Sequence, residues 1–417
     1  MHPRDLSIAD WTYALPEDRI AQRPLEERDA SKLLIYAEGS MQDGSFRDLP
    51  DHLPDNALLV LNDTRVVNAR ILFERITGAR IEVLCLDPAD GAPLERAFDQ
   101  RAACEWHCFI GNAKRWKAGE DLVLRSGPAH SAVQLIARRT GPERVAFRWE
   151  PAELSFAEVL ERVGHVPLPP YMKRPDDTED KERYNTVFAR NEGSVAAPTA
   201  SLHFTPYMIE RAKANGAAIM EVTLHVGAGT FLPVKSERME GHAMHAELVR
   251  IPLAALEMLA ERLGKGPIVP VGTTALRTLE SVYWHGAMLL QGRAGTALDV
   301  GQWEPYEHTA DELPSPSDAL SAVIDQLRSR REDRLVGRTS LLIAPGYSFR
   351  YADALVTNFH QPQSTLLLLV AAFVGADWRK IYAHALANGY RFLSYGDGSL
   401  LFRNGPGSPT GVSGSGQ

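Results

Sequence analysis

The sequence predicts an α/β protein that carries a small all-β unit, and three observations lead to this fold class. From residue 194 onward, segments with helical periodicity alternate with short apolar strands, which is typical of α/β layering with several parallel strands. Between about 70 and 150, short segments of alternating polar and apolar residues are separated by Gly, Pro and Asp, as in a small sandwich or barrel. At 417 residues, the chain also exceeds the roughly 250 to 300 residues at which a single core stops growing.

The first 150 residues contain two separate strands and then the β-rich unit. LLIY at 33–36 is the first strand, and the apolar run that begins at 57 is the second, ending at Asn62 and Asp63 with Arg65 on the following turn. The β-rich unit then consists of the segments RIEVLCL, EWHCFIG, EDLVLRS, AVQLIARR and RVAFRWE.

A helix and a proline-rich segment follow the β-rich unit, so we expect a domain crossing near 150. SFAEVLERVG is amphipathic, and Ser155 with Glu158 forms a capping box at its start. HVPLPPYMKRP cannot be helical beyond its first residues. The α/β alternation then runs through TPYMIERAKANG, AAIMEVTLHV, PLAALEMLAERLG, PIVPVGTT, ALRTLESVYW, DALVTNF and STLLLLVAAFVG.

Two further segments carry less information about the fold. Residues 284–338 combine an acidic, proline-rich stretch with a basic, helix-like one, and they give no clear element pattern. The tail 404–417 is rich in Gly, Ser and Pro, so we expect it to be disordered.

Composition and charge indicate a soluble, cytoplasmic protein. The chain is 44% hydrophobic and 24% charged, and it contains neither an apolar run of transmembrane length nor a signal peptide. Its three cysteines are too few and too oddly numbered for a disulfide framework, which indicates a reducing compartment. The net charge of −8 argues against a uniformly basic surface, although contact with phosphates depends on local patches.

Tests for common motifs exclude several classes of enzyme. The sequence has no P-loop, nucleophile elbow or HExxH motif, and VGAGTF lacks the spacing of a dinucleotide fold. CEWHC at 104–108 and HAMHAE at 242–247 contain metal-binding residue types. Structural zinc needs four ligands, and CEWHC has no second pair at metal-like spacing. Two histidines three residues apart are commoner as hydrogen-bonding residues than as ligands, so we expect no metal and keep His242, His245 and Glu247 only as candidates that support a site from behind.

Polar residues gather where three apolar strands end, and this pattern predicts a functional site. The runs are 187–205 with 223–231, then 271–281, then 356–373. Each strand ends in hydroxyl, amide, imidazole or guanidinium groups, and sites of α/β proteins lie beyond the carboxyl ends of strands. His203 and His225 flank two of these turns, so either one is a candidate for proton transfer near neutral pH, with a core histidine as the alternative.

Six segments together resemble the successive motifs of the S-adenosylmethionine:tRNA ribosyltransferase-isomerase family of queuosine biosynthesis. NDTRVVNARI precedes them near the start of the chain, and order and spacing match throughout. The resemblance covers most of the chain outside roughly 75–150 and 284–338. The segments are LPPYMKRPDDTEDKERYNTVFA, GSVAAPTASLHFT, VTLHVGAGTFLPV, VGTTALRTLES, LVTNFHQPQSTLLLLVAAF and YRFLSYGDGSLL.

The resemblance implies a fold, a reaction and a partner. The fold is a large, barrel-like α/β domain, 1–64 plus 151–403, with a small β-barrel domain inserted at 65–150. The reaction transfers and isomerises the ribosyl group of S-adenosylmethionine onto 7-aminomethyl-7-deazaguanine in the tRNA anticodon wobble position. It gives epoxyqueuosine-tRNA and releases adenine and methionine. S-adenosylmethionine is the ribosyl donor, tRNA the partner, and no membrane is involved; we expect a monomer, with a dimer as the alternative.

The resemblance also assigns candidate site residues. His203, His225 and Asp397 are the catalytic candidates, and a turn-capping role is the alternative for Asp397. Lys173 and Arg174 are candidates for contact with tRNA phosphates. The candidates for binding S-adenosylmethionine or the base are Thr199, Phe204, Gly227, Gly229, Thr230, Phe231, Thr273, Thr274, Arg277, Asn358, Phe359, His360, Ser364, Thr365 and Tyr395.

Chemistry gives several of these positions a specific task. Glycines 227 and 229 let the backbone approach a nucleoside, and the phenylalanines stack on a base or belong to the core. Arg277 and Arg65 can hold a carboxylate or phosphate, or pair with Glu280 and Asp63.

Some positions depart from the family pattern and keep two other functions open. Ser201 stands where glycine is usual, and Gln361 stands where an apolar residue is usual. One alternative is a paralogue that transfers the ribosyl group to another acceptor, and the other is a non-catalytic RNA-binding relative. Retention of the candidate catalytic residues weighs against the second.

Overall fold

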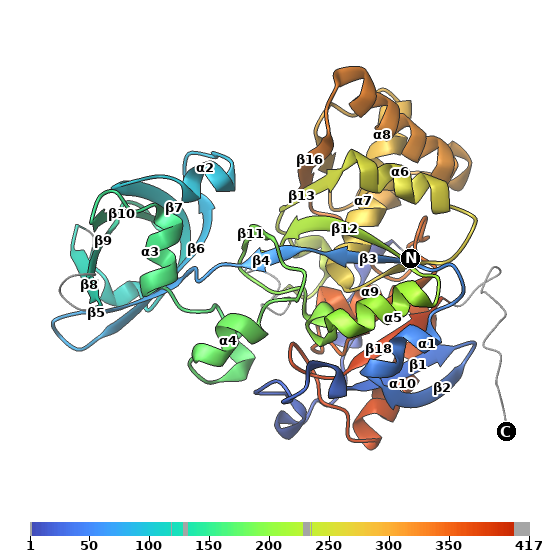
Figure 1. The fold of residues 1–417 in the computed structure, drawn as a ribbon, viewed down its shortest axis with the longest axis horizontal. Helices are drawn as coiled ribbons and strands as arrows, with labels where there is room; N and C mark the ends of the chain where they lie inside the picture. Colours follow the sequence, from blue (N-terminus) through green and yellow to red (C-terminus); the bar gives the residue numbers. More distant parts are fainter. Residues whose placement is uncertain (1, 118, 128–131, 228–233, 235, 404–417) are drawn as a thin grey trace.

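The computed structural model describes residues 2–117, 119–127, 132–227, 234 and 236–403 (Figure 1). The tail 404–417 lies outside the described residues. A larger α/β body lies beside a smaller ring of strands, and the two are joined by extended segments. In the described part of the chain, no helix is long and apolar enough to cross a membrane.

Ten strands of the larger body form two neighbouring sheets. In the six-stranded sheet, the spatial order is β14 (Ile268–Pro270), β3 (Leu58–Asn62), β12 (Ala218–His225), β13 (Glu247–Pro252), β16 (Arg334–Thr339) and β15 (Leu298–Val300). In the four-stranded sheet, the order is β17 (Ala354–Asn358), β18 (Gly398–Phe402), β1 (Lys32–Ala37) and β2 (Ser40–Ser45).

A single parallel bridge between Val271 and Val356 joins the two sheets into one curved, barrel-like wall. Strands β12 and β14 both pair in parallel with β3, and the bridge sets β17 parallel to β14. The carboxyl ends of β3, β12, β14 and β17 therefore meet at one edge, which confirms the mixed α/β class with a barrel-like sheet.

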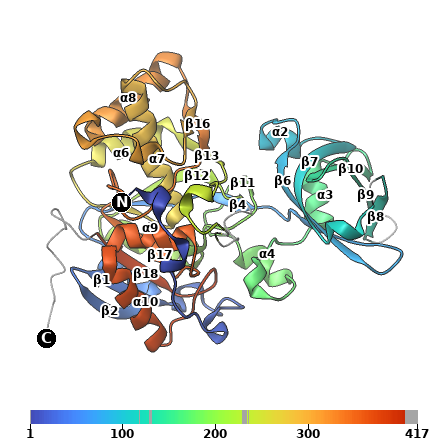
Figure 2. The same cartoon turned by 180° about the vertical axis from the view of Figure 1, so that it is seen from behind.

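Helices cover this wall because each presents an apolar face to it. The long helix α7 is buried over most of its length and contributes Leu276, Leu279 and Val282 to the main core. Figure 2 shows α9 and α10 beside β17 and β18. The helices of the larger body are α1 (Leu49–His52), α5 (Pro206–Ala214), α6 (Leu253–Arg262), α7 (Thr273–Leu290), α8 (Pro316–Arg330), α9 (Thr365–Val374) and α10 (Trp378–Ala387).

The smaller unit is a six-stranded antiparallel barrel. Its first and last strands in the sheet order, β5 and β8, are in contact, so the sheet nearly closes on itself. The helix α3 (Phe156–Val163) packs on it, and Phe147, Phe156 and Trp106 lie in its own apolar core. The order is β5 (Arg70–Glu74), β6 (Arg80–Pro88), β7 (Ala103–Gly111), β10 (Arg144–Glu150), β9 (Val133–Arg139) and β8 (Asp121–Ser126).

Short elements connect the two units. The strand β4 (Thr64–Val66) pairs with β11 (Asn191–Ser194), and α4 (Thr178–Arg183) lies in the segment that returns from the smaller unit. The helix α2 (Leu94–Phe98) lies between β6 and β7 within the smaller unit. The predicted capping box is present, because the Ser155 hydroxyl accepts from the backbone N–H of Glu158 and the Glu158 carboxylate accepts from that of Ser155.

Residues 284–338, which gave no clear pattern, contain β15, α8 and β16. β15 ends the sheet and is three residues long, so it presents almost no alternation to detect. β16 lies between β13 and β15, reads RLVGRT and leaves Arg334 and Arg338 exposed on one face, so it shows no apolar run. Short and polar edge strands are common, since they discourage pairing with other chains, and they are correspondingly hard to find in a sequence.

Candidate active site

The candidate site lies where β3, β12, β14 and β17 end, so the strand ends singled out in the sequence do meet. Asn62 at the end of β3 organises this edge. Its amide nitrogen donates to the carbonyl of Leu224 at 3.0 Å and to the hydroxyl of Thr274 at 3.3 Å. Its amide oxygen accepts from the backbone N–H groups of Thr64 and Leu224. One buried side chain thus fixes three strand or helix ends in relation to one another.

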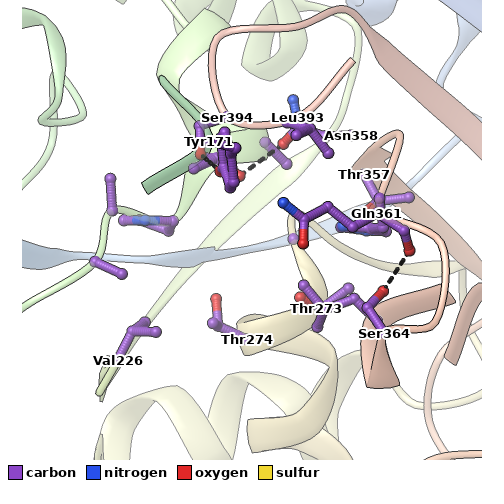
Figure 3. A pocket seen from close by; sticks show the side chains of 18 residues that line it. Tyr171, Val226, Thr273, Thr274, Thr357, Asn358, Gln361, Ser364, Leu393 and Ser394 are labelled. Atoms are coloured by element: carbon purple, nitrogen blue, oxygen red, sulfur yellow. Dashed lines mark hydrogen bonds between the residues drawn. The ribbon is translucent and has the colours of Figure 1, made fainter. Parts of the chain in front are cut away.

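A pocket opens at this edge, with about 730 Å³ of empty space counted out to the solvent (Figure 3). None of the described side chains that line it is Asp, Glu, Lys or Arg, and hydroxyl and amide groups dominate its polar surface. It is lined by Tyr171, Ala196, Ala197, Pro198, Thr199, Ala200, Val226, Gly272, Thr273, Thr274, Thr357, Asn358, His360, Gln361, Ser364, Leu366, Leu393 and Ser394. A concave site whose described lining carries no charged side chain suits a neutral, hydroxylated ligand portion.

Two helices begin at the pocket. The N-terminus of α7 follows Gly272, whose φ of +91° and ψ of 153° belong to a region that only glycine adopts easily. Among the described residues no side chain caps α7, so its first N–H groups and positive dipole end face the pocket. Helix α9 begins at Ser364, whose hydroxyl accepts from the backbone N–H of Leu367 at 3.2 Å.

A hydrogen-bonded chain fixes one wall of the pocket. The hydroxyl of Thr199 donates to the amide oxygen of Asn358 at 2.8 Å, and the amide nitrogen of Asn358 lies 3.5 Å from Nε2 of His203. His203 Nδ1 lies 3.3 Å from the carbonyl of Arg28, so Nδ1 carries the proton and Nε2 accepts. Burial lowers the pKa of His203 to about 4, which keeps this tautomer neutral at pH 7.

The predicted residue His203 therefore lies behind the wall and does not line the pocket. It contacts Asn358 from one side and faces a small cavity with Arg28 and Tyr395 on the other. Its position is that of a residue that orients Asn358.

His225 is placed differently. Its Nδ1 is 2.8 Å from the hydroxyl of Thr64, whereas its Nε2 is buried and has no hydrogen-bond partner among the described residues. The ring lines a groove that adjoins the pocket and shares Val226 with it. Burial lowers the pKa of His225 to about 4, so the ring is neutral and Nε2 is available either to accept or to donate.

His360 is the one predicted histidine that lines the pocket itself. Its Nε2 is 2.8 Å from the hydroxyl of Thr357, and its backbone carbonyl accepts a 2.5 Å hydrogen bond from Tyr13. Burial lowers the pKa of His360 to about 3. The imidazole is neutral at pH 7 and belongs to the uncharged surface of the pocket.

A second cavity, of about 550 Å³ counted to the solvent, adjoins the pocket and shares Leu366 with it. Here Arg277 donates through Nη1 to Glu247 and through Nε to the carbonyl of Leu341 at 3.0 Å. Its Nη2 is buried without a partner among the described residues. His242, His245 and the predicted residue Thr365 also line this cavity.

Asp397 lies outside both cavities. Its carboxylate accepts from the backbone N–H groups of Lys32 and Arg391, at 3.1 and 2.7 Å, and from the guanidinium of Arg391 at 3.3 Å. Asp397 as a whole is 2% exposed. These bonds describe the turn-stabilising alternative, and its catalytic role stays a prediction.

Three predicted aromatic contacts belong to the core. Phe204 packs on Phe46, Phe359 lies among Tyr382, Tyr390 and Phe392, and both phenylalanines are 1% exposed. Neither lines the pocket, because each fills apolar space behind a strand end. The hydroxyl of Tyr395 donates to the buried carboxylate of Asp180 and does not reach the pocket.

The predicted glycine loop is only partly visible. Gly227 lines the groove beside His225. Gly229, Thr230 and Phe231 lie outside the described residues.

The arginines and the lysine singled out in the sequence have found other partners than those considered. Arg277 pairs with Glu247 and not with Glu280, whose carboxylate accepts from Tyr347 and from backbone N–H groups. Arg65 faces Glu192 at 3.8 Å. Arg174 makes a bidentate bond with Asp180, and Lys173 pairs with Glu17 on the surface.

Residues missed at the sequence level form the remaining wall of the pocket. The hydroxyl groups of Tyr171 and Ser394 lie 2.5 Å apart, and burial raises the pKa of Tyr171 to about 12. Thr357 and Gln361 line the pocket beside them, as Figure 3 shows. All four belong to motifs quoted above, but a hydroxyl or amide inside a motif gave no separate signal of its orientation.

Comparison with known proteins matches this arrangement to a family. The profile of the family described as queuosine biosynthesis protein matches residues 8–401. The chain belongs to that family. The segments that carry the queuosine biosynthesis motifs are the ones that build the pocket, since it takes residues from 196–200, 272–274, 357–366 and 393–394.

Relatives in the queuosine biosynthesis family share an enzyme name. A protein of Caulobacter sp. (strain K31) named S-adenosylmethionine:tRNA ribosyltransferase-isomerase is 40% identical over 418 residues, covering 95% of this chain and 97% of its own. One of the same name from Azoarcus sp. (strain BH72) is 41% identical over 401 residues, covering 96% and 98%. Among solved structures, S-adenosylmethionine tRNA ribosyltransferase from Thermotoga maritima is 27% identical, with a TM-score of 0.45, covering 94% of this chain and 99% of its own.

Proposed function

We propose that this chain transfers and isomerises the ribosyl group of S-adenosylmethionine onto 7-aminomethyl-7-deazaguanine in the wobble position of tRNA. The product is epoxyqueuosine-tRNA, and adenine and methionine are released. The observation that carries the proposal is the convergence of the family motifs on one uncharged pocket at the carboxyl ends of parallel strands. The shared name of relatives about 40% identical along nearly their full length supports the same reaction.

The nucleoside part of S-adenosylmethionine fits the uncharged pocket. The hydroxyl oxygens of Thr199 and Ser364 can accept from the ribose hydroxyls, since their own protons are donated to Asn358 and to the carbonyl of Gln361. The hydroxyl of Thr273 can donate or accept. Gly272 and Ala200 leave room for close approach of the sugar, because neither has a side chain beyond Cβ. The N-terminus of α7 favours any negative charge that develops beside it.

The methionine part is assigned to the adjoining cavity. Arg277 lies one helical turn beyond Thr273 and Thr274, so it projects from the same side of α7. Its buried Nη2 is a donor without a partner among the described residues. A carboxylate there would complete the hydrogen bonds of the guanidinium and remove the penalty of an unsatisfied buried donor.

His225 is the group that we assign to proton transfer. In the reaction implied for the family, a proton leaves ribose C5′ beside the sulfonium, adenine is expelled, the amine of the base adds, and a cyclopentane epoxide closes. The positive sulfur acidifies C5′, so a weak base is sufficient. His225 is neutral and oriented by Thr64, and its Nε2 meets no partner among the described residues, whereas His203 is committed to Asn358.

The proposed function also bears on the domain organisation, the cellular compartment and the oligomeric state. We propose that 65–150 form an inserted domain within a discontinuous domain of 1–64 and 151–403, because the barrel has its own apolar core. The three cysteines are free and buried, which suits the reducing cytoplasm. We expect a monomer, with a dimer as the alternative.

The test is incubation of the purified protein with S-adenosylmethionine and tRNA carrying 7-aminomethyl-7-deazaguanine. Nucleoside mass spectrometry and an adenine assay then give the products. Epoxyqueuosine with equimolar adenine is the expected result. Adenine without modified tRNA would indicate another acceptor, and the absence of both products from folded protein that binds tRNA would indicate a non-catalytic relative.

A further inference from the structure

Three arginines lie on one face of the large sheet beside the groove that contains His225. Arg250 is on β13, and Arg334 and Arg338 are on β16. In the antiparallel register, Arg338 is opposite Leu248, Val336 is opposite Arg250, and Arg334 is opposite Pro252. Because side chains two residues apart share a face, all three arginines project to the same side. The distance from Arg334 to Arg338 along β16 is roughly 13 Å at about 3.3 Å per residue.

This arginine stripe, Arg250, Arg334 and Arg338, forms one wall of a groove. The groove has about 1740 Å³ of empty space counted to the solvent, and its opposite wall is the segment 86–94 that leads from β6 into α2. Asp87 is an acidic side chain in that wall. Figures 1 and 2 both show β13 and β16 on the side of the large body that faces the small barrel.

The stripe is continuous with the candidate site. β12 pairs with β13 so that His225 is opposite Leu248, and Leu248 is opposite Arg338. His225, Leu248 and Arg338 therefore form one cross-strand row, and Thr223, Arg250 and Val336 form the next. A chain molecule lying along the arginine stripe reaches His225 within two strand spacings of about 4.8 Å each.

The charges of the stripe reinforce one another. Burial, and then the positive charge of Arg334, lower the pKa of Arg250, so the two guanidinium groups are close enough to repel. The ion pair of Arg334 with Asp333 is on the surface, with the two side chains 56% and 78% exposed, and such pairs contribute little. Like charges gathered in a groove on a chain of net charge −8 favour an anionic partner that offsets the repulsion.

We propose that the arginine stripe binds the sugar-phosphate backbone of the RNA substrate and directs the flanking nucleotides toward the pocket. The inference rests on the proposed function, since it takes tRNA to be the substrate. Guanidinium groups bind phosphates through paired hydrogen bonds without reading the base. The groove beside the small barrel is thus where the anticodon arm lies, and the target base leaves it for the pocket at the strand ends.

The test measures binding of an unmodified anticodon stem-loop RNA by fluorescence anisotropy at several salt concentrations. Variants R250Q, R338Q and the triple variant R250Q/R334Q/R338Q are compared with the wild type. R328Q is the matched control. Arg328 is also an exposed arginine, it lies on α8 and pairs with Glu257 of α6, and its loss changes the net charge by the same amount as one stripe variant. All these side chains are exposed or half-buried, and a thermal unfolding curve of each variant checks that it is folded.

We expect the triple variant to bind the RNA at least tenfold more weakly at moderate salt. The slope of log K against log salt should fall by about 0.7 to 0.9 for each phosphate that the variant no longer neutralises. In the complete reaction, KM for tRNA should rise by a similar factor while kcat and the affinity for S-adenosylmethionine stay unchanged, and R328Q should behave as the wild type.

The outcomes separate this inference from the proposed reaction. If the triple variant binds the RNA with the affinity and salt slope of the wild type, the RNA-binding role of the arginine stripe is overturned, even if the wild type makes epoxyqueuosine. Loss of RNA affinity in the variants, with no epoxyqueuosine from the wild type, would support the stripe and overturn the reaction. A wild type that binds no RNA would overturn both.

Discussion

The side chains of the candidate site are of two kinds. Some face the proposed ligands, and others hold the ligand-facing side chains in place. His225 and His203 were equivalent in the sequence, and the structure separates them by their hydrogen bonds. Nε2 of His225 has no partner among the described residues, whereas Nε2 of His203 accepts from Asn358. The difference lies in which neighbours each ring meets after folding.

Substitution of the two histidines should therefore affect different kinetic constants. We expect H225Q to slow turnover by a factor of about 10² to 10⁴, the usual contribution of a general acid or base, with little change in KM. H203Q should raise KM for S-adenosylmethionine about tenfold through loss of the orientation of Asn358. Steady-state kinetics with both substrates varied provide the measurement, and a larger loss of kcat in H203Q would reverse the assignment.

Buried neutral histidines also give the fold a pH dependence. Burial lowers the pKa of His225 and His203 from 6.5 to about 4, and that of His360 to about 3. The unfolded chain binds protons first on acidification, so the stabilising contribution is complete above pH 6.5 and is lost as the pH falls toward 4. A pKa lowered from 6.5 to about 4 corresponds to about 3 kcal/mol of unfolding free energy.

Urea unfolding at several pH values between 7 and 4 tests this dependence. The free energy of unfolding should fall steeply over that interval in the wild type. It should fall less steeply in H225Q, because glutamine does not titrate. If the free energy of unfolding depends on pH equally steeply in the two proteins, His225 does not contribute to this pH dependence.

At the scale of elements, the start of α7 depends on one glycine. Gly272 has φ +91° and ψ 153°, and its N–H donates to the carbonyl of Val356 across the seam between the two sheets. A Cβ there would contact Thr274 and Ala200 at ordinary distances, so the cost of alanine is conformational. We expect G272A to lower the unfolding free energy by about 1 to 3 kcal/mol and to weaken S-adenosylmethionine binding. Chemical denaturation and calorimetric titration measure both.

Gly295 provides the control for that substitution. Its φ is not positive, and no atom lies within 4 Å of the position where a Cβ would be. G295A should change the unfolding free energy by less than about 0.5 kcal/mol. If both variants behave alike, the conformation of Gly272 is not what positions α7.

Asp397 connects the first residue of β1 to the turn before β18. Because its carboxylate accepts from two backbone N–H groups and from Arg391, D397N should destabilise the fold by about 1 to 3 kcal/mol. At a temperature where the variant is folded, we expect its turnover to stay within a few fold of the wild-type rate. A roughly hundredfold or greater fall in turnover of stably folded D397N would restore the catalytic role that the motif suggested.

The elements show how far the sequence was informative. Alternating patterns predicted β6 to β10, and apolar runs predicted β3, β12, β14 and β17, because burial of one or both faces imposes those patterns. β15 and β16 were among the strands missed, since β15 is a three-residue edge strand and β16 carries arginines on one face. The strand ends predicted the place of the site. Phe204 and Phe359 could not be assigned, because an aromatic in a motif reads the same in a core and in a pocket.

At the scale of the whole molecule, the small barrel has an apolar core separate from the core clusters of the larger body. The barrel core is centred on residues such as Phe147 and Trp106, and the pocket is in the larger body. We expect two thermal transitions in calorimetry, one for each unit. S-adenosylmethionine should raise the midpoint temperature of the larger body's transition and leave that of the barrel unchanged. F147A truncates a fully buried side chain of the barrel core, so it should lower only the midpoint temperature of the barrel's transition.

A single transition that shifts as a whole with S-adenosylmethionine would contradict this expectation. It would mean that contacts across the β4 and β11 connection make the two units unfold together.

The position of β18 has a consequence for synthesis of the protein. This strand, the last one described, lies between β17 and the first strand, β1, and it pairs with both. At about 5 to 20 residues per second, the β1 and β2 hairpin waits roughly 20 to 70 s on the ribosome for its neighbour. The barrel can fold during that time, whereas the nascent larger body keeps an apolar strand edge open. We expect ribosome-bound chains that stop before 398 to bind chaperones and to lack S-adenosylmethionine binding, which pull-down of stalled chains would test. Activity thus begins only after β18 has been synthesised.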